Sequence, residues 1–380
     1  MKNPFQYGGV VGGDAFCNRR RERADLLRAM ENGEKLFVYS ERRMGKTSLV
    51  RLVLDRLPKR SFLPVYVDLW PTDGEESFVA ALARGLAEAM GPSPEKVLDA
   101  ARTFFGRLAP TLTLDTEGKT VVSFGMQRGA KVAQALDEVL AAPSRIAREG
   151  KRRVVIVLDE FQQIMEYGSD LVERRLRSII QHQGDVAFIF LGSRKHLIQK
   201  MFLDGSRPLY RSAGHYPLGG IGVDEWAPFI WERFHNAKRK ISDAQIAEVV
   251  RLTDGHPFYT QHLCHALWEL ADAGRLIPDA LIGEAVATLL DRERYAYTTL
   301  WESLTSNQRR FLEGLARTDE PVQPFAAEFI QRHGLGTASS AQRAVESLLA
   351  RDVIDRDGGS FTILDRFFRL WIQRTQLHPL

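Results

Sequence analysis

The chain has 380 residues, more than one ordinary hydrophobic core holds, so its length predicts two or three domains. Its hydrophobic fraction of 44% and charged fraction of 26% are typical of a water-soluble globular protein. No apolar run approaches the roughly 18 residues of a membrane span, and no secretion signal is recognisable. The cysteines, Cys17 and Cys264, lie far apart, which favours free thiols in a reducing compartment. We therefore expect a cytoplasmic protein with no membrane partner.

The formal net charge is only +4, but the charge is distributed unevenly along the chain. Residues 17–60 carry 13 Lys and Arg against 6 Asp and Glu, whereas residues 300–380 carry 10 of each sign. A nucleic-acid-binding module usually carries its basic excess on itself. The neutral C-terminal segment therefore argues against DNA binding there, without excluding it.

Apolar runs of strand length alternate with helical patterns over the first 220 residues. The predicted strands are residues 35–40, 62–69, 153–158 and 186–191, and predicted helices between them are 46–57 and 75–90. Strands without polar interruption are expected to be covered on both faces. This pattern predicts a parallel α/β sheet. An insertion at about residues 91–150 is predicted to hold a helix near 94–108 and a β-hairpin of 111–114 with 120–124.

After residue 222 the pattern becomes helical. Predicted helices at 224–236, 242–252, 256–273 and 278–297 form a lid-sized domain. Predicted helices at 306–316, 324–333 and 338–350, followed by a short hairpin, form a winged helix-turn-helix. The expected domains are thus an α/β core (1–222), a helical lid (223–299) and a winged-helix domain (300–380).

The segment from Ser40 to Thr47 is typical of a phosphate-binding loop, the Walker A motif, between a buried strand and a helix. Backbone N–H groups and the positive helix end would hold the β-phosphate, and Gly45 allows close approach of the backbone. Lys46 would reach the β- and γ-phosphates, and Thr47 would bind Mg²⁺. Ser40 stands where the first glycine of the motif is usual. The residues expected to line the nucleotide here are Ser40, Glu41, Arg42, Arg43, Met44, Gly45, Lys46, Thr47 and Ser48.

A second half of this site follows the strand 153–158, where Asp159 and Glu160 come directly after five apolar residues. A carboxylate at that strand end is expected beside the phosphate loop. Asp159 is the predicted Mg²⁺ ligand through water, and Glu160 the predicted catalytic residue that polarises the attacking water. This acidic pair is the Walker B motif.

Ser193 follows the strand 186–191 and is predicted to sense the γ-phosphate. That role requires its strand to lie between the strands of the phosphate loop and the acidic pair; a helix N-cap is the alternative. Arg194 and Arg211 are candidates to stabilise phosphate charge, with solvated surface arginine as the alternative for each.

These motifs together resemble a known family. The segments beginning at Asn3 (NPFQYGG), Phe16 (FCNR), Glu41 (ERRMGKTSL) and Val157 (VLDEFQ), with Leu191-Gly-Ser and Pro208-Leu-Tyr-Arg, resemble archaeal-type P-loop ATPases of the STAND and AAA+-related group. The resemblance continues through residues 253–261 (TDGHPFYTQ) and 365–371 (DRFFRLW), and extends distantly to origin-recognition ATPases.

The resemblance implies further roles in nucleotide binding. Phe16 and Arg19 would lie against the adenine base, although Arg20 stands where the family usually has a glutamate. The turn Gly255-His256-Pro257 would sense the nucleotide from the lid. ATP rather than GTP rests on the same likeness, since no Asn-Lys-x-Asp stretch occurs. A metal site at His256, His262, Cys264 and His265 is not expected, because zinc ligand pairs usually come from separate elements.

The expected function is therefore a nucleotide-dependent switch that binds ATP and Mg²⁺ between core and lid, hydrolyses ATP slowly, and reports its state through the winged helix. The partner would be an unknown protein or DNA, with ATP-dependent oligomerisation possible in principle. A DNA-binding initiator ATPase of replication or a mobile element is the alternative. A small-molecule kinase is the third class, but no second substrate pocket is evident.

Overall fold

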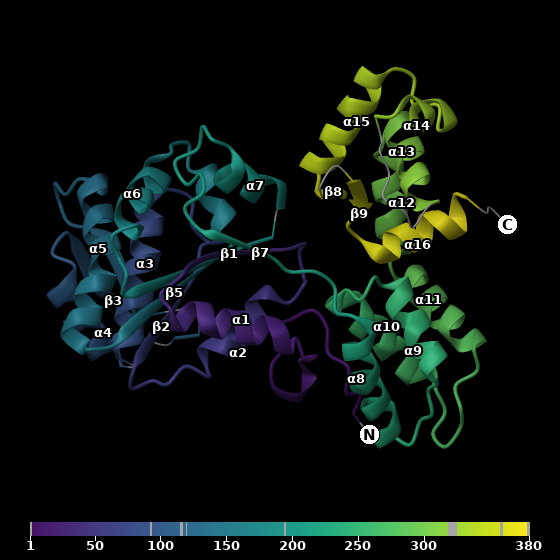
Figure 1. Cartoon of the computed structure of the whole chain (residues 1–380), viewed down its shortest axis with the longest axis horizontal. Coiled ribbons are helices and arrows are strands. Elements are labelled where there is room, and N and C mark those ends of the chain that lie inside the picture. The colour runs from purple at the N-terminus through teal and green to yellow at the C-terminus, as the bar shows by residue number, and fades with distance from the viewer. Residues whose placement is uncertain are drawn as a thin grey trace. The chain divides into compact units, whose positions relative to one another are not determined.

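The computed structural model describes residues 2–91, 93–114, 117–118, 120–193, 195–317, 325–357 and 360–377. The chain forms two compact units (Figure 1). The α/β unit comprises Arg20–Arg42 and Lys46–Leu218. The C-terminal unit comprises Met1–Arg19, Arg43–Gly45 and Gly219–Leu380. The three-domain division at residues 222 and 299 stays a prediction.

The α/β unit is built on a five-stranded sheet in the order β2-β5-β6-β1-β7, in which all neighbours are parallel. Its strands are β1 (Lys35–Tyr39), β2 (Phe62–Asp68), β5 (Arg153–Asp159), β6 (Val186–Gly192) and β7 (Gly214–Pro217). The four predicted strands and their parallel arrangement are confirmed. β7 was not predicted: it is a short, largely exposed edge strand that ends in proline, so it lacks the apolar signature.

Helices cover both faces of this sheet (Figure 1). They are α1 (Arg20–Glu31), α2 (Lys46–Leu54), α3 (Glu75–Met90), α5 (Val132–Gly150), α6 (Leu171–Ile180) and α7 (Lys195–Leu203), with the 3₁₀ helix η2 (Phe161–Glu166). Alternate residues of β5 face opposite layers, so Val154 and Ile156 join the core with α3, α5 and α6. The insertion holds α4 (Pro94–Phe104) and the antiparallel hairpin of β3 (Leu108–Leu114) with β4 (Thr120–Met126). The predicted hairpin is therefore confirmed.

The C-terminal unit is mainly helical. It contains η1 (Gly13–Ala15), α8 (Val223–Asn236), α9 (Asp243–Leu252), α10 (Pro257–Leu270), α11 (Ala280–Arg292) and α12 (Arg294–Glu302). The single helix predicted over residues 278–297 is wrong. The chain leaves helical geometry at Glu293 (φ −92°, ψ 0°), and α12 then packs Tyr297 and Trp301 against Phe368 and Trp371.

The predicted winged helix is confirmed. It consists of α13 (Ser306–Ala316), α14 (Ala327–Arg332), α15 (Ala338–Ala350), the hairpin of β8 (Ile354–Asp357) with β9 (Ser360–Ile363), and α16 (Arg366–Thr375). Thr305 caps α13 reciprocally with Gln308, as a capping box does. The aromatic side chains of α16 are buried, with Phe367 2%, Phe368 1% and Trp371 5% exposed, so they belong to the hydrophobic core of this unit.

Both cysteines are buried free thiols, and burial raises the pKa of Cys17 to about 12. Among the described residues, no helix is long and apolar enough to cross a membrane.

His262 on α10 gives the C-terminal unit a testable pH dependence. Its ring stacks on Tyr7 at a centroid distance of 3.9 Å. Burial, followed by the charges of His265, Arg292 and Arg43, lowers the pKa of His262 from 6.5 to about 4. The unfolded chain then binds a proton before the folded chain does, so the stability that the neutral ring provides is lost as pH falls from about 6.5 to about 4.

We expect acidification over that interval to lower the free energy of unfolding by about 1–2 kcal/mol through His262, a value discounted for its partial exposure. Urea unfolding of the natural chain and of His262→Phe, measured at pH 7 and pH 5, tests this. The phenylalanine variant should lose less stability than the natural chain between the two pH values. Equal losses would contradict the assignment.

Candidate nucleotide site

A buried strand, a tight loop and a helix form the predicted phosphate loop. β1 ends at Tyr39 and α2 begins at Lys46. Gly45 has φ +83°, a left-handed conformation that glycine adopts without strain. A Cβ on Gly45 would meet no atom within 4 Å, so backbone conformation rather than lack of space requires glycine here. The strand–loop–helix geometry suits an anion at the positive end of α2.

The Lys46 ammonium is held inside the loop by oxygen atoms. Its Nζ donates to Ser40 Oγ at 2.8 Å and to the Glu41 carbonyl at 2.9 Å. The Ser40 hydroxyl in turn donates to the Glu41 carbonyl at 2.9 Å, and Ser40 is fully buried. The serine that replaces the usual glycine thus provides one acceptor for the lysine predicted to bind phosphate.

Three groups meet at the carboxylate of Asp159, which is 3% exposed. Thr47 Oγ1 donates to Asp159 Oδ2 at 2.7 Å, and the Tyr66 hydroxyl donates to the same oxygen at 2.6 Å. The Glu160 amide donates to Asp159 Oδ1 at 2.9 Å. The structure therefore brings the two predicted Mg²⁺-binding side chains together.

Tyr66 was missed by the sequence analysis. It lies in β2, next to β5 in the sheet, and the Arg51 guanidinium lies over its ring at 4.3 Å. Burial and the nearby Asp159 charge raise the pKa of Tyr66, so its hydroxyl stays a donor at neutral pH. Its sequence signal was weak, because tyrosine is also an ordinary strand residue.

The predicted catalytic carboxylate and the predicted sensor contact each other. Ser193 Oγ donates to Glu160 Oε2 at 2.7 Å, and the Gln162 side-chain amide donates to the same carboxylate. The Ser193 amide donates to Gln162 Oε1 at 3.3 Å. β6 lies between β1 and β5, as the sensor prediction requires. Gln162, 3% exposed, is a second residue that the sequence analysis missed.

Of the two arginine candidates, the structure describes Arg211. Arg211 is exposed, has φ +51°, and lies 5.1 Å from the ring of Tyr210. Its role in phosphate binding stays a prediction. Arg194 lies outside the described residues.

The N-terminal residues and the tip of the loop belong to the C-terminal unit. Arg19 is 1% exposed, and its guanidinium donates to the carbonyls of Met44 at 3.2 Å and Gly219 at 2.9 Å. The Arg43 guanidinium lies over the Phe258 ring at 4.4 Å. Phe16 is partly buried just after η1. Arg42 is exposed, Ser48 is buried, and the adenine contacts expected of Phe16 and Arg19 stay predictions.

The conformation of the Gly255-His256-Pro257 turn is fixed by close packing and by hydrogen bonds. Gly255 has φ +62°, and a Cβ there would come within 2.1 Å of the Ile221 carbonyl, so only glycine fits. The Gly255 carbonyl accepts from the Ile221 amide at 2.9 Å. His256 Nδ1 accepts from the Phe258 amide at 3.2 Å, so this ring caps α10, and Pro257 occupies the first turn.

Comparison with known proteins places these features in a family. Residues 16–263, about two thirds of the chain, match the model of an ATPase domain predominantly from Archaea, and residues 295–374 match a probable winged helix domain. No curated protein sequence matches.

Solved structures share the fold. A Walker-type ATPase of Pyrococcus abyssi is 18% identical with a TM-score of 0.65, over 97% of this chain and 99% of that one. The ORC2 protein of Aeropyrum pernix, in ADPNP and ADP complexes, is 14% identical with a TM-score of 0.52, over 95% of each chain. The chain belongs to the family of ATPase domains found predominantly in Archaea, here followed by a winged helix.

Proposed function

We propose that this chain is an ATP-dependent molecular switch that binds ATP with Mg²⁺, hydrolyses it slowly, and reports its nucleotide state through the winged helix. The ATPase family supports nucleotide binding. The observation that carries the switch is an ion pair that joins the predicted nucleotide-sensing turn to the winged helix.

The residues at Asp159 fit Mg²⁺. The ion prefers hard oxygen ligands, and the Thr47 hydroxyl and the Asp159 carboxylate provide them side by side, 2.7 Å apart. Bound Mg²⁺ would neutralise charge on the phosphates. Tyr66 holds Asp159 Oδ2 in place from β2, and the Glu160 amide holds Oδ1, so the carboxylate is oriented from two directions.

Glu160 is the proposed base. A carboxylate that accepts hydrogen bonds from Ser193 and Gln162 has fewer free lone pairs with which to orient water. Hydrolysis would then require Glu160 to exchange these contacts for one to water, which supports the proposal of slow hydrolysis. The same contacts link the state of the base to Ser193, the proposed γ-phosphate sensor.

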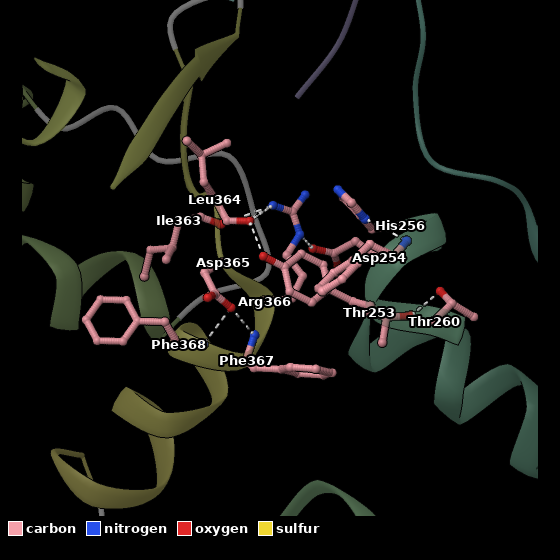
Figure 2. A network of polar contacts seen from close by, with 12 residues as sticks. Thr253, Asp254, His256, Thr260, Ile363, Leu364, Asp365, Arg366, Phe367 and Phe368 are labelled. Atoms are coloured by element: carbon pink, nitrogen blue, oxygen red, sulfur yellow. Dashed lines mark hydrogen bonds and ion pairs between the residues drawn. The ribbon is translucent and has the colours of Figure 1, made fainter. Parts of the chain in front are cut away.

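The turn is connected to α16 by the network in Figure 2. Arg366 Nε forms an ion pair with Asp254 Oδ2 at 2.9 Å, and the arginine side chain is only 8% exposed. Arg366 Nη1 also donates to the carbonyls of Ile363 at 3.1 Å and Leu364 at 3.0 Å. Asp254 has φ +52° and directly precedes Gly255. A change of backbone conformation in the turn would therefore move a charge that Arg366 contacts.

The winged-helix side of this junction is rigidly held. Asp365 caps α16 through the amides of Phe367 at 2.9 Å and Phe368 at 3.0 Å, and it accepts from the Tyr297 hydroxyl. Tyr259 of α10 donates to the Leu364 carbonyl at 3.5 Å. Movement of Asp254 would thus shift α16 as a rigid element through Arg366. A helix that moves in this way can report the nucleotide state to a partner.

Arg366→Met is expected to uncouple the nucleotide-sensing turn from the winged helix. ATP turnover should stay within about twofold, because Arg366 is not part of the phosphate site, while the ATP-dependent change in hydrogen exchange of α13 and α15 should fall below the detection limit. Removing one partner of a largely buried ion pair destabilises the fold. Asp254→Asn serves as the milder variant, because the Asp254 side chain is 46% exposed whereas that of Arg366 is 8% exposed.

Arg343→Met, which alters an exposed arginine of α15, is the matched control and should keep the change. If Arg366→Met and Asp254→Asn both fold and both keep the full ATP-dependent change, the proposed connection is wrong.

The winged helix also raises the alternative of a DNA-binding initiator ATPase. Its third helix, α15, carries one arginine, Arg343, and one acidic residue, Glu346, and the described part of the hairpin is not basic either. DNA binding depends mainly on cationic contacts to phosphate. Titration of duplex DNA at 50 and 200 mM salt decides between the two: tight binding with a steep salt dependence would favour the initiator.

A further inference from the structure

A pocket lies in the α/β unit, at the end of the sheet opposite the phosphate loop. It is a pocket of about 540 Å³ where β2 and β5 begin and α5 ends. Its charged lining residues are Arg60, Arg148, Lys151, Arg152, Arg153 and Asp185, called here the basic pocket. All strands of the sheet are parallel and the phosphate loop follows the end of β1, so the two sites lie at opposite strand ends.

Charge is concentrated at the basic pocket. Five cations and one carboxylate give it a formal charge of +4, as much as the whole 380-residue chain. Like charges gathered around one hollow repel one another unless anions share the space. An anionic ligand bound in the pocket would therefore relieve repulsion among these cations.

Most of these cations form no ion pair with any residue that the structure describes. Across the described part of the chain, no salt bridge involves Arg60, Arg148, Lys151 or Arg152, while Arg153 donates to the Glu31 carbonyl. Cations near a helix C-terminus complement its dipole, which accounts for those at the end of α5. The helix dipole does not account for Arg60, which precedes β2. Because Arg60 lines the same pocket as the cations at the end of α5, we take the cluster as evidence for a ligand.

The lining indicates the kind of anion. One arginine guanidinium can donate two parallel hydrogen bonds to two oxygens of a phosphate group. The aromatic ring that lines the pocket, Phe62, is 8% exposed and paired into β2, so little surface is left to stack on a base. The volume lies in the range of small-molecule sites, about 300–1,000 Å³.

We propose that the basic pocket binds a compact anion with two or more phosphate groups, at a site separate from the ATP site. The sources of such a group are an inorganic oligophosphate and the phosphate chain of a nucleotide. The proposal does not depend on the switch function, because it involves none of the residues of the phosphate loop.

Calorimetric titration of the full chain with inorganic tripolyphosphate, at constant ionic strength, tests the proposal. Lys46→Ala serves as the background, so that the phosphate loop does not compete. One site is expected, and Arg148→Gln with Arg152→Gln should weaken it at least tenfold. Arg102→Gln with Arg128→Gln removes the same charge from exposed positions outside the pocket and should change the affinity less than twofold.

A parallel titration with ATP in the same background distinguishes the sources. Equal affinities support recognition of phosphate alone, and tighter ATP binding that Arg148→Gln with Arg152→Gln removes supports a nucleotide in the pocket. Equal weakening by both pairs of substitutions, or binding of duplex DNA without binding of tripolyphosphate, would overturn the proposal.

Discussion

Replacing Lys46 by alanine is expected to weaken ATP binding at least about tenfold and to abolish hydrolysis. The ammonium is held at 2.8 Å from Ser40 Oγ and 2.9 Å from the Glu41 carbonyl, within the loop predicted to surround the β- and γ-phosphates. Without it, the phosphate charge would lose a charge-assisted contact in a buried setting, and removal of such a contact costs about 1.5–3 kcal/mol or more. We expect affinity for ATP to fall at least about tenfold and turnover to reach background.

Fluorescent-nucleotide binding and phosphate release measure these two effects. Lys200→Ala, at an exposed position on α7, is the control and should behave as the natural chain. If Lys46→Ala folds and binds ATP with unchanged affinity, the nucleotide does not occupy the predicted phosphate loop and the site assignment fails.

Replacing Glu160 by glutamine is expected to separate binding from chemistry. The amide retains the shape of the side chain but cannot accept a proton from water. Loss of a general base reduces turnover by about 10²–10⁴-fold. ATP affinity should change little, because Mg²⁺ and phosphate contacts are assigned to Thr47, Asp159 and Lys46.

Single-turnover hydrolysis together with equilibrium ATP binding checks this expectation. Glu166→Gln, at the exposed end of η2, makes the same chemical change seven residues beyond Asp159 and should leave turnover intact. Hydrolysis by Glu160→Gln at the natural rate would show that another group activates the water.

The site residues that could be predicted from the sequence are those that lie in short, continuous motifs. A buried strand before Gly45-Lys46-Thr47 and an apolar strand before Asp159-Glu160 are one-dimensional signals, because each motif is continuous along the chain. The parallel sheet then brings the motifs together, and the 2.7 Å contact of Thr47 with Asp159 agrees with that expectation.

Residues that act through side-chain contacts between separate strands or helices were not predictable in this way. Tyr66 reaches Asp159 because β2 pairs with β5 at a particular register. Gln162 reaches Glu160 and Ser193 because Glu160 turns with φ +52° into a 3₁₀ helix. No periodicity marks either position. The break at Glu293 was hidden for a related reason, since both flanking segments are good helix formers.

The junction of Asp254 with Arg366 and the basic pocket are also products of tertiary structure. Residues 112 positions apart form the junction, and the pocket gathers cations from before β2, from the end of α5 and from the start of β5. The pocket alone has a formal charge of +4, equal to that of the whole chain. Four of these cations lie within residues 148–153 of the sequence, but only the fold brings Arg60 to them.

The switch is tested most directly by hydrogen exchange of residues 253–257 and 363–368 in Glu160→Gln, compared between saturating ATP and saturating ADP, each with Mg²⁺. Protection of both segments is expected to change together between the two nucleotides, and Arg366→Met in the same background should confine the change to residues 253–257. Identical protection of both segments in ATP and ADP would contradict a nucleotide-dependent switch read out by the winged helix.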